Sequence, residues 1–317
     1  MRGIELARAY WEAFGREMLE NDFPAMEEKI AVGLCGSGSE CLGYDDEISR
    51  DHDFEPGFCL FLPGEEEVDR REAFRLERAY AKLPQTFEGI SRSRMYPVGG
   101  NRHGVIRRTD FLLEKTGTPD GMLSVADWLT LPEQNLLEVT GGEIWRDDSG
   151  AFSRIRKQLS AMPEDIRLRK LSGELLLMNQ SGQYNYRRCL NHGERGAAML
   201  AAGEFVRAAI HALLLLDDRY MPYYKWAFRA LRVGGEKRRF QADRLEKILF
   251  GDMDEEAAVE REILIAETAQ EITEELQEKG LTEAGCCDLE QHAYSVENRI
   301  QDPEIRNMHI LSGVRNG

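Results

Sequence analysis

The stretch Ile30-Ala-Val-Gly-Leu-Cys-Gly-Ser-Gly-Ser39 decides the expected fold of this chain. Its first six residues form a short apolar run, and a run of this length next to glycine and serine favours a buried strand over a helix. The turn Gly36-Ser-Gly-Ser39 follows directly. Because glycine has no Cβ to block a close approach, the backbone N–H groups of such a turn are suited to binding a phosphate.

The segments on either side complete an α/β pattern. Residues 58–63 form a second short apolar strand, and residues 65–83 have the periodicity of a surface helix. Residues 1–30 carry apolar side chains three or four positions apart, which predicts one long opening helix. We therefore expect an α/β (α+β) domain with a small mixed sheet.

The signals alternate between residues 99 and 148 and become almost uniformly helical beyond residue 150. The alternating part predicts a strand at 105–106, a helix capped at 109–110, a short helix at 127–129 and an extended segment over 135–140. The expected domains are thus an α/β domain over 1–150 and an all-α helical bundle over 151–317. A length of 317 residues fits two domains.

Composition and charge narrow the classes of partner. The chain has 41 Lys and Arg against 57 Asp and Glu, a formal net charge of −16, and its mean hydropathy is −0.48. Such a charge repels a phosphate backbone or an anionic lipid surface, so long DNA and membranes are not expected partners. We see no secretory signal and no apolar run approaching the ~18 residues of a membrane span, so a cytoplasmic location is expected. The six cysteines contain no Cys-x-x-Cys pair, which indicates reduced thiols.

Two carboxylates lie shortly after the glycine-serine turn. Asp51 and Asp53 are separated by one residue at the expected start of the strand leading to Phe58, so the period of two places both on one face. Magnesium prefers one or two carboxylates together with substrate phosphate oxygens. The alternative is a solvated acidic pair beside a turn, but the turn and the apolar strands favour a site for Mg²⁺ or Mn²⁺.

These residues resemble a known signature. Gly36-Ser37, a spacer over residues 38–50, and Asp51-His52-Asp53 resemble the Gly-Ser…Asp-x-Asp signature of the DNA polymerase β-like nucleotidyltransferase superfamily, which includes the kanamycin and minimal nucleotidyltransferases. Residues 127–129, 141–147 and 220–226 look like the domain-of-unknown-function family 4037. His52 departs from the signature, because an apolar residue is usual there.

The resemblance implies roles for individual residues. Gly36 and Ser37, with Gly38 and Ser39 of the same turn, would hold the phosphates of a nucleoside triphosphate. Asp51 and Asp53 would hold the metal, and Lys225 would lie beside Trp226 on a helix of the second domain that faces the cleft.

A third carboxylate, as metal ligand or general base, has two candidates. Asp110 follows the strand at 105–106, although it could be only a helix cap. Glu138 lies on the extended segment expected over 135–140. Lys225 also has two interpretations, a contact to a nucleotide phosphate or a surface lysine packed against Trp226.

The expected function is metal-dependent transfer of a nucleoside monophosphate from a nucleoside triphosphate to an unidentified acceptor hydroxyl, with release of pyrophosphate. The acceptor could be a small molecule, an RNA end or a protein. A second hypothesis is a catalytically inactive nucleotide-binding or regulatory protein of the same fold. A third is a ribonuclease acting through Arg187 and His192, a pair that arises easily by chance.

Overall fold

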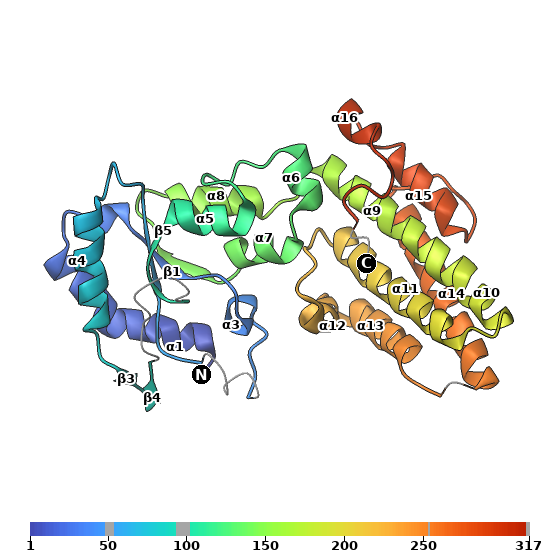
Figure 1. The fold of residues 1–317 in the computed structure, drawn as a ribbon, viewed down its shortest axis with the longest axis horizontal. Coiled ribbons are helices and arrows are strands. Elements are labelled where there is room, and N and C mark those ends of the chain that lie inside the picture. The colour runs from blue at the N-terminus through green and yellow to red at the C-terminus, as the bar shows by residue number, and fades with distance from the viewer. Residues whose placement is uncertain (48–53, 93–101, 253, 315–317) are drawn as a thin grey trace. The chain divides into compact units, whose positions relative to one another are not determined.

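The computed structural model describes residues 1–47, 54–92, 102–252 and 254–314, and the chain divides into two compact units (Figure 1). Unit 1 consists of Met1–Leu123 with Pro132–Ala161, and unit 2 of Ser124–Leu131 with Met162–Gly317. The division does not fall at residue 150, because the chain passes between the units three times. Helix α8 (Ala151–Leu159) belongs to unit 1, whereas α6 (Val125–Thr130) belongs to unit 2.

A four-stranded mixed sheet forms the centre of unit 1. Its order is β5 (Gly104–Arg107), β2 (Cys59–Leu62), β1 (Ala31–Leu34) and β6 (Glu143–Arg146). Strand β1 is antiparallel to both of its neighbours, whereas β2 and β5 are parallel. Every residue of β1 and β2 is buried, which explains why both strands are continuous apolar runs. The expected fold class, an α/β unit with a small mixed sheet and a helical bundle, is confirmed.

Helices cover both faces of this sheet (Figure 1). On one face Leu60 and Leu62 join the core made with α1 (Gly3–Tyr10), α2 (Arg16–Asp22) and α4 (Arg70–Ala81). On the other face Phe61 contacts the ring of Phe111 in α5 (Arg108–Thr116) at 5.2 Å and that of Phe152 in α8 at 4.5 Å. Shorter elements of the unit are a wide helical turn at Trp11–Gly15, α3 (Ser39–Leu42), β3 (Thr86–Phe87) and β4 (Ile90–Ser91).

The segment expected to be extended over 135–140 is helical, so that prediction is wrong. Helix α7 spans Glu133–Thr140 and begins after Pro132. Leu136 and Val139 are both fully buried, and a spacing of three residues places them on one helical face. Packing of this apolar face against the rest of unit 1 therefore stabilises a helix over these residues.

A tyrosine fixes the chain at the start of β2. The hydroxyl of Tyr80 accepts the Phe58 N–H at 3.0 Å and donates to the Phe58 carbonyl at 2.9 Å. The ring centres of the two residues lie 4.9 Å apart, and burial raises the pKa of the Tyr80 hydroxyl. The guanidinium of Arg92 lies 4.7 Å from the Tyr80 ring centre. Helix α4 therefore anchors the residues on the N-terminal side of β2.

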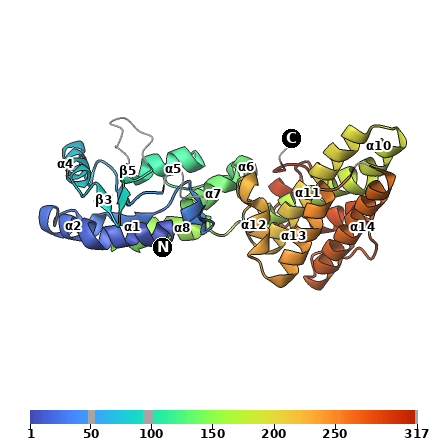
Figure 2. The ribbon, with the colours of Figure 1, turned by 90° about the horizontal axis from the view of Figure 1, so that it is seen from below.

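In the residues that the structure describes, the regular elements of unit 2 are all helices. Helices α9 (Glu164–Met178) and α11 (Arg195–Leu216) pack against each other, and α11 lies among the other helices in both views (Figure 1 and Figure 2). A wide helical turn over Asn179–Tyr186 extends α9. The remaining helices are α10 (Arg187–Asn191), a single turn at Tyr224–Trp226, α12 (Ala227–Arg232), α13 (Glu236–Leu249), α14 (Glu255–Glu278), α15 (Leu289–Glu297) and α16 (Pro303–Arg306).

Helix α11 is long and apolar enough to cross a membrane by length and composition alone. In this structure, 67% of its most apolar window is buried within the protein. That burial is typical of the central helix of a bundle.

Charged side chains lie inside unit 2, where Arg167, Arg169 and Lys170 of α9 are all buried. Arg169 is completely buried and donates to the Ile305 carbonyl at 2.8 Å, while its guanidinium also pairs with Glu297. Helix α9 is surrounded by other helices, so it has no outer face over these residues. His211 of α11 is also buried, with Nδ1 2.7 Å from Oε1 of Glu174.

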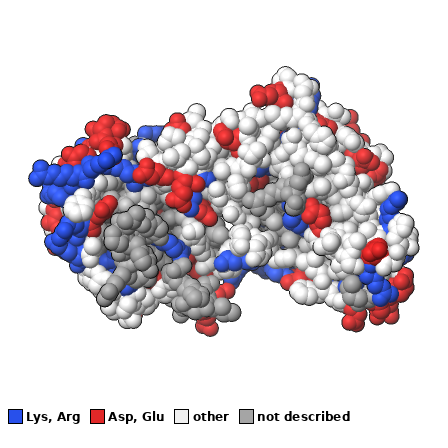
Figure 3. Space-filling model, in the orientation of Figure 1, with Lys and Arg blue, Asp and Glu red and all other residues white. Residues whose placement is uncertain are grey.

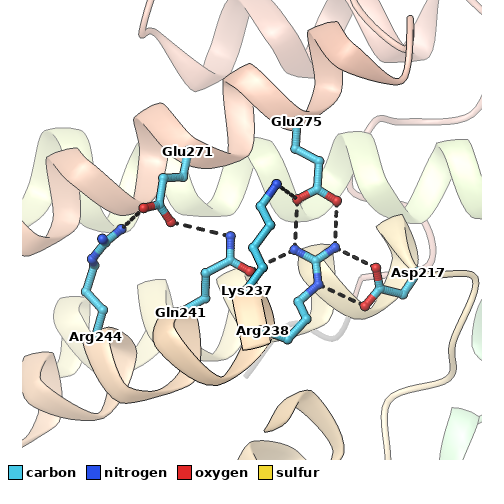
Figure 4. Close-up of polar contacts among 7 residues, drawn as sticks. All are labelled: Asp217, Lys237, Arg238, Gln241, Arg244, Glu271 and Glu275. Atoms are coloured by element: carbon cyan, nitrogen blue, oxygen red, sulfur yellow. Dashed lines mark hydrogen bonds and ion pairs between the residues drawn. The ribbon is translucent and has the colours of Figure 1, made fainter. Parts of the chain in front are cut away.

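A buried polar cluster joins three helices of unit 2 (Figure 4). Arg238 of α13 is 4% exposed and donates to Asp217 at the end of α11, to Gln241, and to Glu275 of α14. These five hydrogen bonds of 2.6–2.8 Å use all five guanidinium donors. Lys237 also contacts Glu275, at 2.9 Å. The cluster therefore fixes the relative positions of α11, α13 and α14.

Candidate functional site

A pocket of about 690 Å³ lies in unit 1 along strand β5. Its walls are the end of β1 with the turn that follows it, helix α3, one face of α4, strand β5 and the first two turns of α5. Sites for small molecules and cofactors in known proteins typically have volumes of about 300–1,000 Å³. The pocket is a candidate site because it has such a volume and includes the turn that follows β1.

The glycine-serine turn forms one end of this pocket. Gly36 and Gly38 have φ angles of +125° and +149°, a backbone conformation that favours glycine. A Cβ on Gly38 would overlap the guanidinium of Arg102 and the carboxylate of Glu40. Gly36 and Ser37 line the pocket, whereas Gly38 and Ser39 continue the turn into α3.

Arg102 holds the turn in place. Its Nη2 donates to the Ser37 carbonyl at 2.6 Å, and the same guanidinium forms an ion pair with Glu40. The next residue, His103, is 8% exposed and has Nδ1 3.3 Å from Oε1 of Glu55. Arg102, two residues before β5, thus holds the turn after β1.

Asp110 lines the same pocket as Gly36 and Ser37. It was considered as a helix cap, but Arg107 occupies the cap position and Asp110 is the third residue of α5. Its carboxylate is exposed, and a contact of 3.5 Å joins it to the Thr109 hydroxyl. The structure thus brings together a turn and a carboxylate that are more than 70 residues apart in the sequence.

Glu138 does not line the pocket. It lies on α7 and accepts from Nζ of Lys115 at 2.7 Å, while Glu114 contacts the same nitrogen at 2.8 Å. Burial opposes the charge of Lys115, but the hydrogen bonds from the two carboxylates outweigh it and raise the pKa of Lys115. Glu138 therefore holds a charged lysine at the pocket wall, a contact that the sequence did not reveal.

Asp51 and Asp53 lie outside the described residues, as does His52. Strand β2 begins at Cys59, six residues after Asp53. Among the residues that the structure describes, no group of three or more His, Cys, Asp or Glu side chains could hold a metal ion. The metal site expected from the two aspartates stays a prediction.

Two more cations border the pocket, and sequence reasoning missed both. Arg107 is the last residue of β5 and donates to the Pro63 carbonyl at 2.9 Å. Arg78 of α4 lies over the exposed ring of Phe74, 5.8 Å from its centre. Lys and Arg side chains stand beside Asp and Glu side chains where α4 lies (Figure 3). The position of Arg107 at the end of a strand was a usable signal, whereas that of Arg78 required the fold.

Three buried thiols lie at or near the pocket: Cys35 and Cys41 are among its lining residues, and Cys59 is the first residue of β2. Burial raises the pKa of the Cys35 thiol to about 12, and it also raises the pKa values of Cys41 and Cys59. All three are free cysteines. Thiols that stay protonated near neutral pH are poor nucleophiles and poor metal ligands, so these residues serve as packing.

Lys225 belongs to unit 2 and is not part of the pocket lining. Its Nζ lies 5.0 Å from the ring centre of Trp226. Two of the basic residues that follow Lys225 in the sequence are neutralised. Arg232 pairs with Glu246 at 2.6 Å, and Arg238 belongs to the buried cluster. Arg187, considered for a ribonuclease, forms an ion pair of 3.1 Å with Glu262.

Comparisons with known proteins give two similarities. The model of the family described as "Domain of unknown function (DUF4037)" matches residues 128–227, about a third of the chain. The fold is also similar to that of a nucleotidyltransferase-like protein from Exiguobacterium sibiricum, with 12% identity and a TM-score of 0.36. That similarity covers 84% of this chain and 79% of the other. No curated protein sequence matches the chain.

Proposed function

We propose that the chain is a nucleotidyltransferase that uses Mg²⁺ or Mn²⁺ and transfers a nucleoside monophosphate from a nucleoside triphosphate to an acceptor hydroxyl. One observation carries the proposal. Gly36 and Ser37, which sequence reasoning assigned to phosphate binding, line the same pocket as Asp110, a candidate third carboxylate. A shared active site explains why the phosphate-binding turn and this carboxylate lie in one pocket better than chance does.

The pocket has groups of both kinds that this chemistry needs. The N–H groups of the Gly36-Ser37 turn would bind phosphate oxygens. Arg107 and Lys115 bring positive charge to the wall on the side of β5 and α5. Asp51 and Asp53, which lie outside the described residues, would supply the carboxylate oxygens that Mg²⁺ prefers, and Asp110 adds a carboxylate at the pocket wall. When bound, the metal would neutralise charge on the triphosphate and on the departing pyrophosphate.

The reaction balances with the chain's own residues. The acceptor hydroxyl oxygen forms a bond to the α-phosphorus, while the bond between that phosphorus and the bridging oxygen to the β-phosphorus breaks. The electron pair of the broken bond leaves on pyrophosphate, and the hydroxyl proton passes to a carboxylate oxygen of Asp110. The role of Glu138 is to hold the Lys115 ammonium, 2.7 Å away, in its place at the pocket wall.

Transfer of label tests this proposal. The protein is incubated with each of the four ribonucleoside triphosphates, labelled at the α- or the γ-phosphorus, together with total RNA, hydroxyl-rich small molecules or no added acceptor. We expect label from the α-phosphorus to be retained on an acceptor and label from the γ-phosphorus to be released as pyrophosphate. Asp110→Asn should lower the rate about 100-fold or more, which is the usual contribution of a general base.

Matched variants separate the two candidate carboxylates and the inactive alternative. Glu138→Gln should lower the rate less than about tenfold, because it weakens the placement of Lys115 only. Asp120→Asn, an exposed change outside the pocket lining, should have no effect. Binding of a triphosphate without any pyrophosphate release, with every acceptor, would support the inactive nucleotide-binding protein and contradict the enzyme.

A further inference from the structure

Aromatic and basic side chains gather on the surface of unit 2 where the chain enters α12. We call the residues Tyr223, Tyr224, Lys225, Trp226 and Arg229 the aromatic-basic strip. Tyr223 is 45% exposed and Tyr224 is 74% exposed. Positively charged side chains are visible where α12 lies (Figure 3). The strip contains the last four residues of the motif over 220–226, which the sequence singled out and which the proposed active site does not use.

The members of the strip lie against one another. The rings of Tyr223 and Tyr224 have centres 4.3 Å apart, with an angle of 46° between their planes. The Trp226 ring has Nζ of Lys225 5.0 Å from its centre and the guanidinium carbon of Arg229 at 5.6 Å. Three aromatic rings and two cations thus occupy seven consecutive positions of the chain.

The strip differs from other basic residues nearby. Arg232 is paired with Asp243 at 3.1 Å and with Glu246 at 2.6 Å, and Arg238 is buried with Asp217 and Glu275. Lys225 is exposed, and no ion pair involves it within the part of the chain that the structure describes. Single exposed apolar residues are ordinary, but adjacent exposed aromatic rings next to an unneutralised cation are typical of a binding surface.

We propose that the aromatic-basic strip binds a short single-stranded nucleic acid. A base can stack on the open face of Tyr224, whose neighbour Tyr223 holds the ring on its other side, and the Lys225 ammonium can contact a phosphate. Charge limits the length of the strand, because the net charge of −16 repels a long polyanion while a local cation attracts a short one. Stacking does not depend on base identity, so little sequence preference is expected.

This inference names an acceptor class for the proposed function. A hydroxyl at the end of the bound strand would be the group that receives the nucleoside monophosphate. That identification rests on the proposed function, whereas binding of the strand to the strip does not. The main experiment therefore measures binding of the strand alone, without triphosphate or metal, and triphosphate binding is measured separately.

The test uses the full chain and fluorescein-labelled ten-residue oligouridylate and oligothymidylate, followed by fluorescence anisotropy at low salt. We expect both to bind, and Tyr224→Ala to weaken binding about tenfold because one stacking plane is lost. Tyr224→Phe keeps the ring and should bind as the wild type does. Lys225→Gln should lower the slope of log affinity against log salt by about one, since one phosphate contact is lost.

Controls come from exposed residues of the same types elsewhere in unit 2. Tyr294→Ala on α15, where the tyrosine is 47% exposed, and Lys279→Gln at the end of α14 should leave binding unchanged. The proposal is overturned if neither oligonucleotide binds, or if Tyr294→Ala weakens binding as much as Tyr224→Ala does. Oligonucleotide binding without any triphosphate binding would overturn only the proposed function. Triphosphate binding without oligonucleotide binding would overturn only the proposal that the aromatic-basic strip binds nucleic acid.

Discussion

The buried cluster around Arg238 gives the most sharply defined test of the fold. Arg238→Met removes five hydrogen bonds of 2.6–2.8 Å and leaves the carboxylate of Glu275, in a residue that is 4% exposed, without its main partner. Breaking a buried pair by removing one member costs about 3–5 kcal/mol, because the remaining charge is buried without compensation. Lys237, 2.9 Å from Glu275, offsets part of that cost.

Native-state hydrogen exchange measures this effect within unit 2. Each 1.4 kcal/mol is about a factor of ten in an opening equilibrium, so amides of α13 and α14 should exchange about 10²–10³ times faster in the variant. Amides of α4, in unit 1, serve as the internal control. Arg232→Met removes a partly exposed arginine and its two ion pairs, and should cost less than about 1 kcal/mol. Equal effects of the two substitutions on α13 would refute this reasoning.

Three further predictions concern pH, a helix end and the glycine turn. Burial opposes ionisation of Glu275, but hydrogen bonds from Arg238 and Lys237 outweigh burial and lower the pKa of this carboxyl below the ordinary 4.5. The ionised carboxylate therefore stabilises the fold fully above pH 4.5, and this stabilisation is lost as the pH falls through the pKa of the folded state. The difference in unfolding free energy between wild type and Glu275→Gln should accordingly shrink from about pH 6 to about pH 3, and a constant difference would contradict it. Arg156→Met removes donors to the Val139, Thr140 and Gly141 carbonyls at the end of α7. The free energy of unfolding in urea should fall by about 2–3 kcal/mol, whereas the exposed control Arg154→Met should cause no measurable change. Gly38→Ala places an alanine at a φ of +149° with its Cβ against Arg102. The free energy of unfolding, measured by thermal denaturation, should fall by about 2–3 kcal/mol, and triphosphate binding should weaken. The control Gly43→Asn, at a φ of +68°, should be tolerated.

The apolar pattern predicted the secondary structure best where it is a continuous buried run or has a clear helical spacing. The strands β1 and β2 and the helices α4, α11 and α14 follow directly from apolar runs or helical spacing. The strand β6 was missed, because its residues Glu143–Arg146 are partly exposed and pair with β1 only after the chain has returned from α7. The helical state of α7 was not predicted, because burial of its apolar face depends on contacts with distant segments of the chain.

The candidate site was predictable in its parts but not in its assembly. The glycine-serine turn and Asp110 were identified separately, since each is a local feature of the sequence. Their common pocket depends on the parallel pairing of β5 with β2, a contact between segments more than 40 residues apart. The same dependence explains why Glu138 was retained as an alternative, because only the position of α7 against α5 reveals its partner Lys115.

Buried charge was the least predictable property. Arg167, Arg169 and Lys170 alternate with leucine, which is the pattern of a helix with one solvated face. In the structure α9 is enclosed by other helices, and Arg169 finds carbonyl and carboxylate partners on α15 and α16, more than 120 residues later. Long-range hydrogen bonds of this kind leave no local signal.

Calorimetric titration with the four ribonucleoside triphosphates, with and without Mg²⁺, measures whether the protein binds a nucleotide together with a metal ion. We predict that at least one triphosphate binds to the wild type and that binding depends on Mg²⁺. Asp53→Asn should abolish the Mg²⁺-dependent part while circular dichroism stays unchanged. A failure of every triphosphate to bind the folded wild-type protein in the presence of Mg²⁺ would contradict the proposed function.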